Sequence, residues 1–224
     1  IDAKKATYSI NQGIWGTSVG GKETLTSRYT LPEEAYPTPL KTDCEPKKIS
    51  ITFEQGEITA LNDKKYEHAT DVIIALNEIA STYAIGRDIH VGDTIIGIKG
   101  RVGFEAAAPL IIIKAHHLLE KHTLTKQQLF WKDQLSNVYG SNLHEGLFYE
   151  PLMRDLEAFM TNTQANVTGK VFIKLQAYRF ELVGIESPYD LMSNKFGSYG
   201  EMNNAWSGDD VKGYEKIAGN QIMI

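Results

Sequence analysis

The chain has 224 residues and a mass of 25.0 kDa, with 42% hydrophobic and 23% charged residues, so it can bury a substantial core in one large domain or two small ones. A net charge of −5, a pI of about 5.7 and no long run of Lys and Arg argue against a nucleic-acid or anionic-membrane surface and favour small-molecule or protein partners. The apolar stretches are too short to cross a bilayer and Cys44 is a lone cysteine, so we expect a soluble, cytoplasmic protein in a reducing compartment.

The first segment, residues 1–45, holds scattered Gly, Thr and Pro without a sustained period, which predicts an irregular arm. Within it, GTSVGGKETL at residues 16–25 nearly matches a Walker A loop, but Glu23 stands where that loop needs a hydroxyl and no buried apolar strand precedes it. GTSVG also matches the G-x-S-x-G string of a hydrolase, without the strand-turn-helix context. We interpret the stretch as a glycine-rich binding loop or an ordinary surface loop.

Residues 48–86 predict a hairpin followed by a helix. KISITFE and ITALND surround the turn EQGE as two strands of a β-hairpin. Apolar residues then recur at three-to-four spacing from a candidate N-cap at Thr70 to a stop at Gly86, which predicts an amphipathic helix. Beyond it, DTIIGIKG (residues 93–100) predicts a strand that runs into the glycine- and cation-rich loop KGRVG.

The second half of the chain predicts three more helices before its tail, and a second hairpin. EAAAPLIIIKAHHLLEKH (residues 105–122) is apolar on nearly all sides and should form a buried helix. Thr125 and Gln128 make a capping box for the next helix, and Pro151 suits the first turn of another, in which Leu152, Leu156, Phe159 and Met160 share a face. TGKVFIKLQ and YRFELVGIE alternate as two antiparallel strands.

The expected fold is therefore α+β, with a mostly antiparallel sheet (two hairpins plus a further strand) packed with helices. We divide the chain into the irregular N-terminal arm, 1–45, a central α+β domain, 46–186, and a tail, 187–224. The tail is rich in Gly, Asn and Ser until a short terminal helix that begins near Asp209.

Two side-chain clusters invite a chemical interpretation. In HHLLEKH, His116 and Glu120 lie one helical turn apart, but a zinc site needs at least three converging ligands and His117 and His122 point elsewhere at this spacing. We interpret this cluster as a polar edge of the buried helix and expect no metal. In KGRVG, Lys99 and Arg101 could contact an anion or could simply be solvated loop cations, and the sequence leaves both possibilities open.

Five stretches carry a family resemblance: SVGGKETL, LNEIAS..AIGR.I, IGIKGRVGFEAAAPLIIIKAH, VTGKVFIKL and VGIESP.DLM. In this order and spacing they resemble the carboxy-terminal synthetase and oligomerisation half of argininosuccinate synthase, and the similarity runs over essentially the whole chain. The SGGxD loop of that family's nucleotide-binding half does not occur here. We therefore expect a fragment that is inactive by itself.

The resemblance implies a cytoplasmic, homotetrameric carbon–nitrogen ligase of arginine biosynthesis that joins citrulline and aspartate through an adenylated citrulline. ATP with Mg would be bound mainly by the absent amino-terminal half. Two citrulline-holding serines of the family fall on Ser9 and Ser18, which makes 1–45 a substrate-binding arm and 187–224 a tail for oligomerisation. The alternative is a non-catalytic oligomerisation or amino-acid-binding module of the same fold.

The chain departs from the family pattern at two positions that the resemblance implies contact the substrate. A contacting Glu of the family falls on Gly92, and a contacting Tyr falls on Phe104. Either the neighbouring Asp93 substitutes for the lost carboxylate, or the polar end of the substrate differs, as it would in an N-acyl citrulline. The expected substrate-binding residues are thus Ser9, Ser18, Asp93 and Phe104, with Lys99 and Arg101 near negative charge and no assigned catalytic residue.

Overall fold

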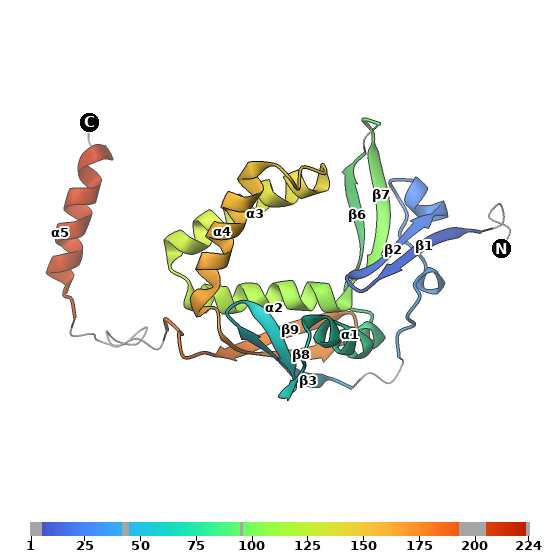
Figure 1. The fold of residues 1–224 in the computed structure, drawn as a ribbon, viewed down its shortest axis with the longest axis horizontal. Helices are drawn as coiled ribbons and strands as arrows, with labels where there is room; N and C mark the ends of the chain where they lie inside the picture. Colours follow the sequence, from blue (N-terminus) through green and yellow to red (C-terminus); the bar gives the residue numbers. More distant parts are fainter. Residues whose placement is uncertain (1–5, 42–44, 95, 193–204, 223–224) are drawn as a thin grey trace.

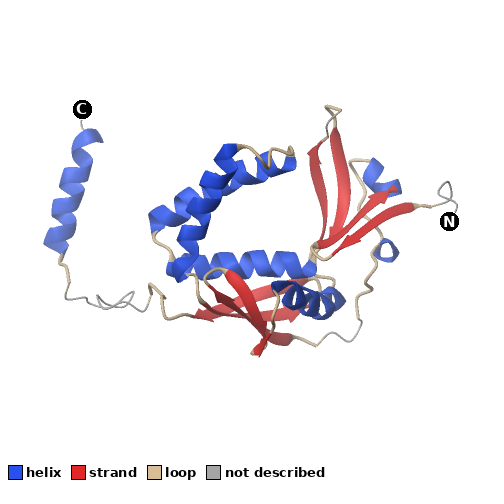
Figure 2. Ribbon diagram, viewed as in Figure 1, coloured by secondary structure: helices blue, strands red, loops and turns tan. Residues whose placement is uncertain are grey.

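The computed structural model describes residues 6–41, 45–94, 96–192 and 205–222, and of Gln221 the backbone alone. Over these residues the fold is α+β, as expected, with five α-helices and two antiparallel sheets of four and five strands (Figures 1 and 2). The two sheets lie at different places along helix α2 (Ala107–Thr123), and the helices α3 (Lys126–His144) and α4 (Pro151–Thr163) form an arch over it.

The five-stranded sheet contains both predicted hairpins. Its strands are, in spatial order, β5 (Lys64–Lys65), β4 (Glu57–Leu61), β3 (Lys47–Glu54), β8 (Gly169–Gln176) and β9 (Arg179–Glu186). At its centre β3 pairs with β8 from Lys47 opposite Leu175 to Phe53 opposite Gly169. This pairing joins segments more than a hundred residues apart, and the sequence carries no local signal for it.

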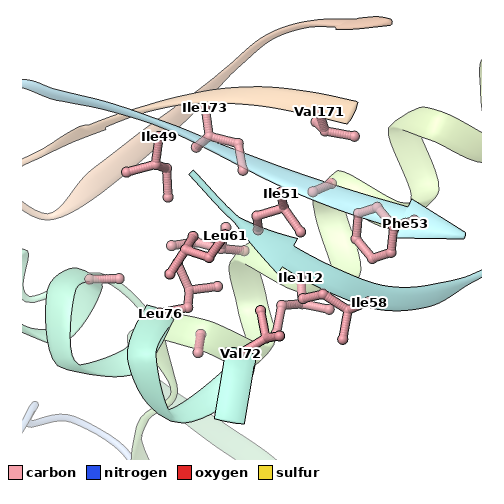
Figure 3. Packing of buried hydrophobic residues seen from close by; sticks show 14 of the residues in the cluster. Ile49, Ile51, Phe53, Ile58, Leu61, Val72, Leu76, Ile112, Val171 and Ile173 are labelled. Carbon is pink, nitrogen blue, oxygen red and sulfur yellow. The ribbon is translucent and has the colours of Figure 1, made fainter. Parts of the chain in front are cut away.

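One face of this sheet forms the main hydrophobic core. Alternate residues of the two central strands are buried on that face: Ile49, Ile51, Phe53, Val171, Ile173 and Leu175. Helices α1 (Ala69–Ala80) and α2 cover it, and Val72, Leu76 and Ile112 point from them into the core (Figure 3). Each fully buried aliphatic side chain of this kind contributes about 1.5–3 kcal/mol.

The helices agree with the predictions in number and position and differ in detail. Helix α1 has His68, not Thr70, as its N-cap, and it continues as a 3-10 turn to Tyr83. Helix α2 is buried on one side only, since Leu110 and Ile113 are exposed, so the expectation of burial all round was wrong. The helix carries apolar residues on more sides than the sheet can cover, so some of them remain exposed.

Helices α3 (Lys126–His144) and α4 (Pro151–Thr163) begin as predicted. Thr125 Oγ1 accepts a hydrogen bond from Gln128 N at 3.3 Å, and Gln128 Oε1 accepts one from Thr125 N at 3.0 Å, which completes the capping box. Pro151 occupies the first turn of α4. The predicted apolar face is partly wrong, because Met153 is buried while Leu152 is exposed.

Glu120 joins these helices to α2. Its carboxylate is only 1% exposed, and Oε1 accepts hydrogen bonds from Lys132 Nζ on α3 and from Gln164 Nε2 after α4, each at 2.9 Å. His116 Nδ1 lies 3.6 Å from the same oxygen. The HHLLEKH cluster is therefore a structural junction, and among the described residues no group of three or more His, Cys, Asp or Glu is placed to hold a metal ion.

The stability of this junction should depend on pH through His116. Burial lowers the pKa of its imidazole, whose ring packs edge-on against Phe53 at 5.3 Å between centroids. His116 thus binds a proton more weakly in the folded chain than in the unfolded chain, where the pKa of its imidazole is about 6.5. The stabilisation is fully present above that pH and is lost as the pH falls through the lower, folded-state pKa.

We therefore expect the free energy of unfolding in urea to decrease between pH 7.5 and pH 5.5, and to decrease less in His116→Gln. The neighbouring variant His117→Gln is the control, because that ring is more exposed, and it should keep the wild-type dependence. An equal dependence in His116→Gln and wild type would contradict the assignment.

The four-stranded sheet corrects two predictions. Its strands are, in spatial order, β1 (Tyr8–Gly13), β2 (Gly16–Gly21), β7 (Lys99–Glu105) and β6 (Arg87–Asp93). Residues 8–21 form a hairpin, so the arm is not irregular there. Residues 96–98 of the predicted strand 93–100 lie in the turn between β6 and β7, and KGRVG belongs to strand β7.

The reason for both errors is that this sheet depends on distant partners. Strand β2 pairs with β7, from Thr17 opposite Glu105 to Val19 opposite Gly103. The β1–β2 turn is only Ile14 and Trp15 between two glycines, and Gly16 has a φ of 127° that other residues rarely adopt. The sheet therefore combines two strands of the predicted arm with two strands of the predicted central domain.

Arg87 connects the later part of the arm, around residues 33–36, to this sheet. Its guanidinium donates to Glu105 Oε2 at 3.1 Å and to Glu33 Oε1 at 2.7 Å, and it lies 4.4 Å from the centroid of the Tyr36 ring. Arg87 and Glu105 are 6% and 5% exposed at their side chains. Beside them Val19, Leu31 and Ala35 form a second, smaller core.

The tail begins against α2 and ends in the predicted helix. Leu191 N donates to the carbonyl oxygen of His122 at 2.8 Å, and His122 Nδ1 lies 3.0 Å from Asp190 Oδ1. Helix α5 (Gly208–Gly219) stands apart from the other elements (Figure 1). In the described part of the chain, no helix combines the length and the apolar character that crossing a bilayer requires.

Candidate substrate-binding site

The strand register brings both predicted serines to one face of the four-stranded sheet. Residues directly opposite each other in antiparallel strands share a face, and alternate residues along a strand do too. Ser9 lies opposite Gly20, and Ser18 lies opposite both Asn11 and Phe104. We call this side the serine face, and it also carries Asp88, His90, Gly92, Gly100 and Val102.

Ser9 and Ser18 lie diagonally across the β1–β2 hairpin, within the reach of one small ligand. Ser9 is exposed and Ser18 is half-buried. Within the described residues neither hydroxyl has a hydrogen-bond partner, so both can donate to or accept from a ligand. The hairpin thus converts a nine-residue spacing in the sequence into a shared surface.

The stretch GTSVGGKETL has neither of the two architectures that its letters suggest. It forms strand β2 and then a single 3-10 turn, Lys22–Leu25, in which Gly21 N donates to Thr24 Oγ1 at 2.9 Å. A phosphate loop and a nucleophile elbow both require a strand followed by an α-helix. The glycines instead serve the hairpin that carries Ser18.

The structure places the other charged candidates on the opposite face. Asp93 lies opposite Lys99 at the ends of β6 and β7, and the two side chains form an ion pair. Arg101, two residues further along β7, donates from Nη2 to the carbonyl oxygen of Tyr29 at 3.0 Å. These three residues therefore do not join the two serines, and each has a partner within the protein.

Phe104 and Gly92 do lie on the serine face, together with a residue that the sequence did not single out. The ring of His90 contacts Phe104 edge-on, with 6.2 Å between centroids and an angle of 75°. A Cβ atom placed on Gly92 would lie 2.9 Å from His90 Nε2, so the imidazole fills the space that a side chain at position 92 would need. Alternation along β6 could have revealed His90, had the strand been predicted.

An open groove of about 720 Å³ runs beside this histidine, between the β6–β7 hairpin and the C-terminal end of α3. Its strand wall includes His90 and Gly92 and, from the opposite face of the hairpin, Asp93 and Arg101. Its helical wall consists of Ser141, His144 and Glu145. The groove is large enough for an amino-acid derivative. Its polar groups are two imidazoles, two hydroxyls, the carboxylates of Asp93 and Glu145 and the guanidinium of Arg101, which suits a small polar ligand.

The class of protein that this arrangement defines is an α+β domain with two serines on one face of an antiparallel sheet, a surface that can hold a small polar ligand. Residues 8–224 match the family model "Arginosuccinate synthase C-terminal domain", and the chain belongs to that family.

Curated relatives agree with the family assignment. The chain is 36% identical over 222 residues to an argininosuccinate synthase of Dictyoglomus thermophilum, which covers 99% of this chain and 55% of that protein. It is 34% identical over 227 residues to one of Methanocaldococcus jannaschii, covering 100% of this chain and 56% of the relative. One of Bacillus pumilus is 37% identical over 195 residues, covering 86% and 48%. The chain spans about half the length of these relatives.

Proposed function

We propose that this chain is the citrulline-binding and assembly half of an ATP-dependent ligase that joins citrulline to aspartate, in the cytoplasm, as a step of arginine biosynthesis. The observation that carries the proposal is the serine face, on which the strand register gathers Ser9, Ser18 and Phe104. The names of the relatives support the same reaction. ATP with Mg is bound mainly by the half of the relatives that this chain does not cover.

The chemistry explains why such a site consists of positioning groups. A ureido carbon is a poor electrophile without a leaving group. Its oxygen therefore attacks the α-phosphorus of ATP and pyrophosphate departs; the aspartate amine then attacks the ureido carbon, and AMP departs with that oxygen. Orientation and charge stabilisation supply the rate in such a sequence. Ser9 and Ser18 orient the citrulline by hydrogen bonds, and no residue of this chain is assigned as an acid or base.

The test uses the protein as its gene encodes it, with Mg-ATP, aspartate and citrulline carrying ¹⁸O in the ureido group. We expect one ¹⁸O atom to appear in AMP and none in pyrophosphate, because the oxygen leaves with AMP. Mass spectrometry of the nucleotides is the measurement, and unlabelled citrulline is the control. Label in neither product, or ADP formation in place of AMP, would contradict the ligase mechanism.

The assembly part of the proposal concerns the terminal helix. Val211, Tyr214 and Ile217 are exposed on α5, and apolar side chains at this spacing form one stripe along a helix. We expect the chain to self-associate through this stripe, as half of a homotetramer-forming enzyme would. Sedimentation velocity of the whole chain should show an oligomer, and removal of the residues after Asp209 should reduce it to a smaller species.

The replacement Val211→Ser, Tyr214→Ser, Ile217→Ser keeps the chain length and should have the same effect as the truncation. A replacement at the exposed Lys212 is the matched control, because it lies on the same helix outside the stripe. A monomer in every variant, wild type included, would remove self-association from the proposal.

A further inference from the structure

Strand β1 forms one outer edge of the four-stranded sheet, and its outer side is open (Figure 1). The residues from Ser9 to Gly13 are all exposed, and the exposed fraction of Ile10 is 46%. Within the described part of the chain, neither Ile10 nor Gln12 forms a hydrogen bond outside the β1–β2 ladder. Unpaired backbone N–H and C=O groups at such an edge can pair with another strand.

The backbone hydrogen bonds show which residues of β1 direct their polar groups outward. Along an antiparallel strand, alternate residues bond to opposite neighbours. Thr94 N donates to Ile98 O and Ala106 N donates to Gly86 O, so the even-numbered residues of β6 and β7 bond to each other. The odd-numbered residues of β7 therefore bond to β2, and the register then makes the odd-numbered residues of β1 bond to β2. The residues of β1 that direct N–H and C=O away from the sheet are Tyr8, Ile10 and Gln12.

The other edges of the two described sheets carry features that oppose pairing, and β1 carries none of them. Strand β6 has charged residues at both ends, and β5 consists of Lys64 and Lys65 alone. Strand β9 has charged residues at both ends and a register shift in its ladder. Charges, very short strands and bulges are the usual means by which proteins protect sheet edges. The sequence of β1, YSINQG, has no charge and no proline, and its ladder is unbroken.

A second copy of the same strand fits this edge without conflict. A two-fold axis perpendicular to the sheet relates two β1 strands in the antiparallel direction, and the register centred on Ile10 pairs the most outward-directed groups. Ile10 then faces Ile10 of the second copy, a favourable apolar pair of β-branched side chains. The flanking pairs are Tyr8 with Gln12 and Ser9 with Asn11. Each of these pairs is neutral, so no like charges meet across the axis.

We propose that β1 is a self-association edge, at which two copies of this chain join their four-stranded sheets into one continuous sheet. The inference deepens the assembly part of the proposed function and rests on it, because a closed tetramer with two-fold axes needs two different interfaces and the stripe on α5 supplies one. Since the axis is perpendicular to the sheet, both serine faces lie on the same side. Asn11 of each copy then lies beside Ser9 of the other, so each copy adds a side chain to the edge of its partner's site.

The experiment is sedimentation velocity of this chain and of variants at Ile10. Ile10→Lys places two ammonium groups opposite each other at the axis and removes the apolar pair, so the dissociation constant of the β1 interface should rise on the order of tenfold or more. Ile10→Pro should also weaken this interface, because it removes an outward N–H and leaves the bonds between β1 and β2 in place. A thermal melt checks that both variants keep the wild-type fold.

Val183→Lys is the matched control, because Val183 is also exposed on an edge strand, β9. It should keep the wild-type oligomer. Combination with the α5 variant separates the two interfaces. The triple replacement Val211→Ser, Tyr214→Ser, Ile217→Ser should leave a dimer joined through β1, and Ile10→Lys alone should leave a dimer joined through α5. The combination of both should be monomeric.

Three results would overturn the inference. A monomer in the triple replacement would do so and leave assembly through α5 intact, and so would a wild-type oligomer that persists in Ile10→Lys. The same variants are also measured in the protein as its gene encodes it. If Ile10→Lys dissociates this chain but not that protein, another segment covers β1 there. Failure of the ligase reaction is distinguished from all three, because the ¹⁸O experiment measures it separately.

Discussion

Arg87→Ala is expected to lower the free energy of unfolding by about 3–5 kcal/mol, the usual cost of removing one partner of a buried ion pair. The variant leaves the Glu105 carboxylate buried without its counter-charge, because Glu105 is only 5% exposed. It also releases Glu33 and the Tyr36 ring, which the same guanidinium holds. Since these contacts attach residues 33–36 to the sheet, proteolysis should become faster in this segment.

Chemical denaturation followed by circular dichroism measures the effect. Glu33→Gln is the matched control, because its side chain is 49% exposed and exposed pairs are worth about 1 kcal/mol or less. The double variant Arg87→Met, Glu105→Leu should regain most of the loss, since it leaves no unpaired buried charge. If the free energy of unfolding falls as little in Arg87→Ala as in Glu33→Gln, the guanidinium does not hold the arm against the sheet.

Ser18→Ala is expected to lower kcat/KM for the citrulline substrate ten- to a hundredfold in the protein as its gene encodes it. One hydrogen bond to a charged ligand group is worth about 1.5–3 kcal/mol, which corresponds to that range. The fold should hardly change, because the pairing of Ser18 with Asn11 and Phe104 uses the backbone and not the hydroxyl.

Steady-state kinetics and a thermal melt of the same preparation separate the two effects. Ser136→Ala is the control, because that serine is exposed on α3 and its hydroxyl donates a hydrogen bond only to the carbonyl oxygen of Asp133 in the same helix. It should retain wild-type kinetics. If Ser18→Ala keeps full kcat/KM with an unchanged melt, the serine face does not hold the substrate.

The local features of the fold were accessible from the sequence. The Thr125–Gln128 capping box, the proline that begins α4 and the hairpin around Gly56 each depend on residues within one turn of one another. Backbone propensity and side-chain capping act over this distance, so a short window contains the whole signal. The family resemblance needed no structure either, since it lies in the order of five short stretches.

The site was predictable only in part. Ser9, Ser18 and Phe104 were named from the resemblance, and the register places all three on one face. Asp93 was named as a substitute for the family carboxylate; it lies on the opposite face of β6, paired with Lys99, and it also lines the groove beside Gly92. A shift of one position reverses the face of a strand residue, and the sequence alone did not reveal where the strand lay.

What only the tertiary structure decided are the contacts between distant segments. The β1–β2 hairpin of the arm is part of a larger sheet because β2 pairs with β7, and the central sheet forms because β3 pairs with β8. Glu120 on α2 contacts Lys132 on α3 and Gln164 after α4. Such pairings are selected by the burial of whole faces and of charges within them, a collective free energy that no short stretch of sequence contains.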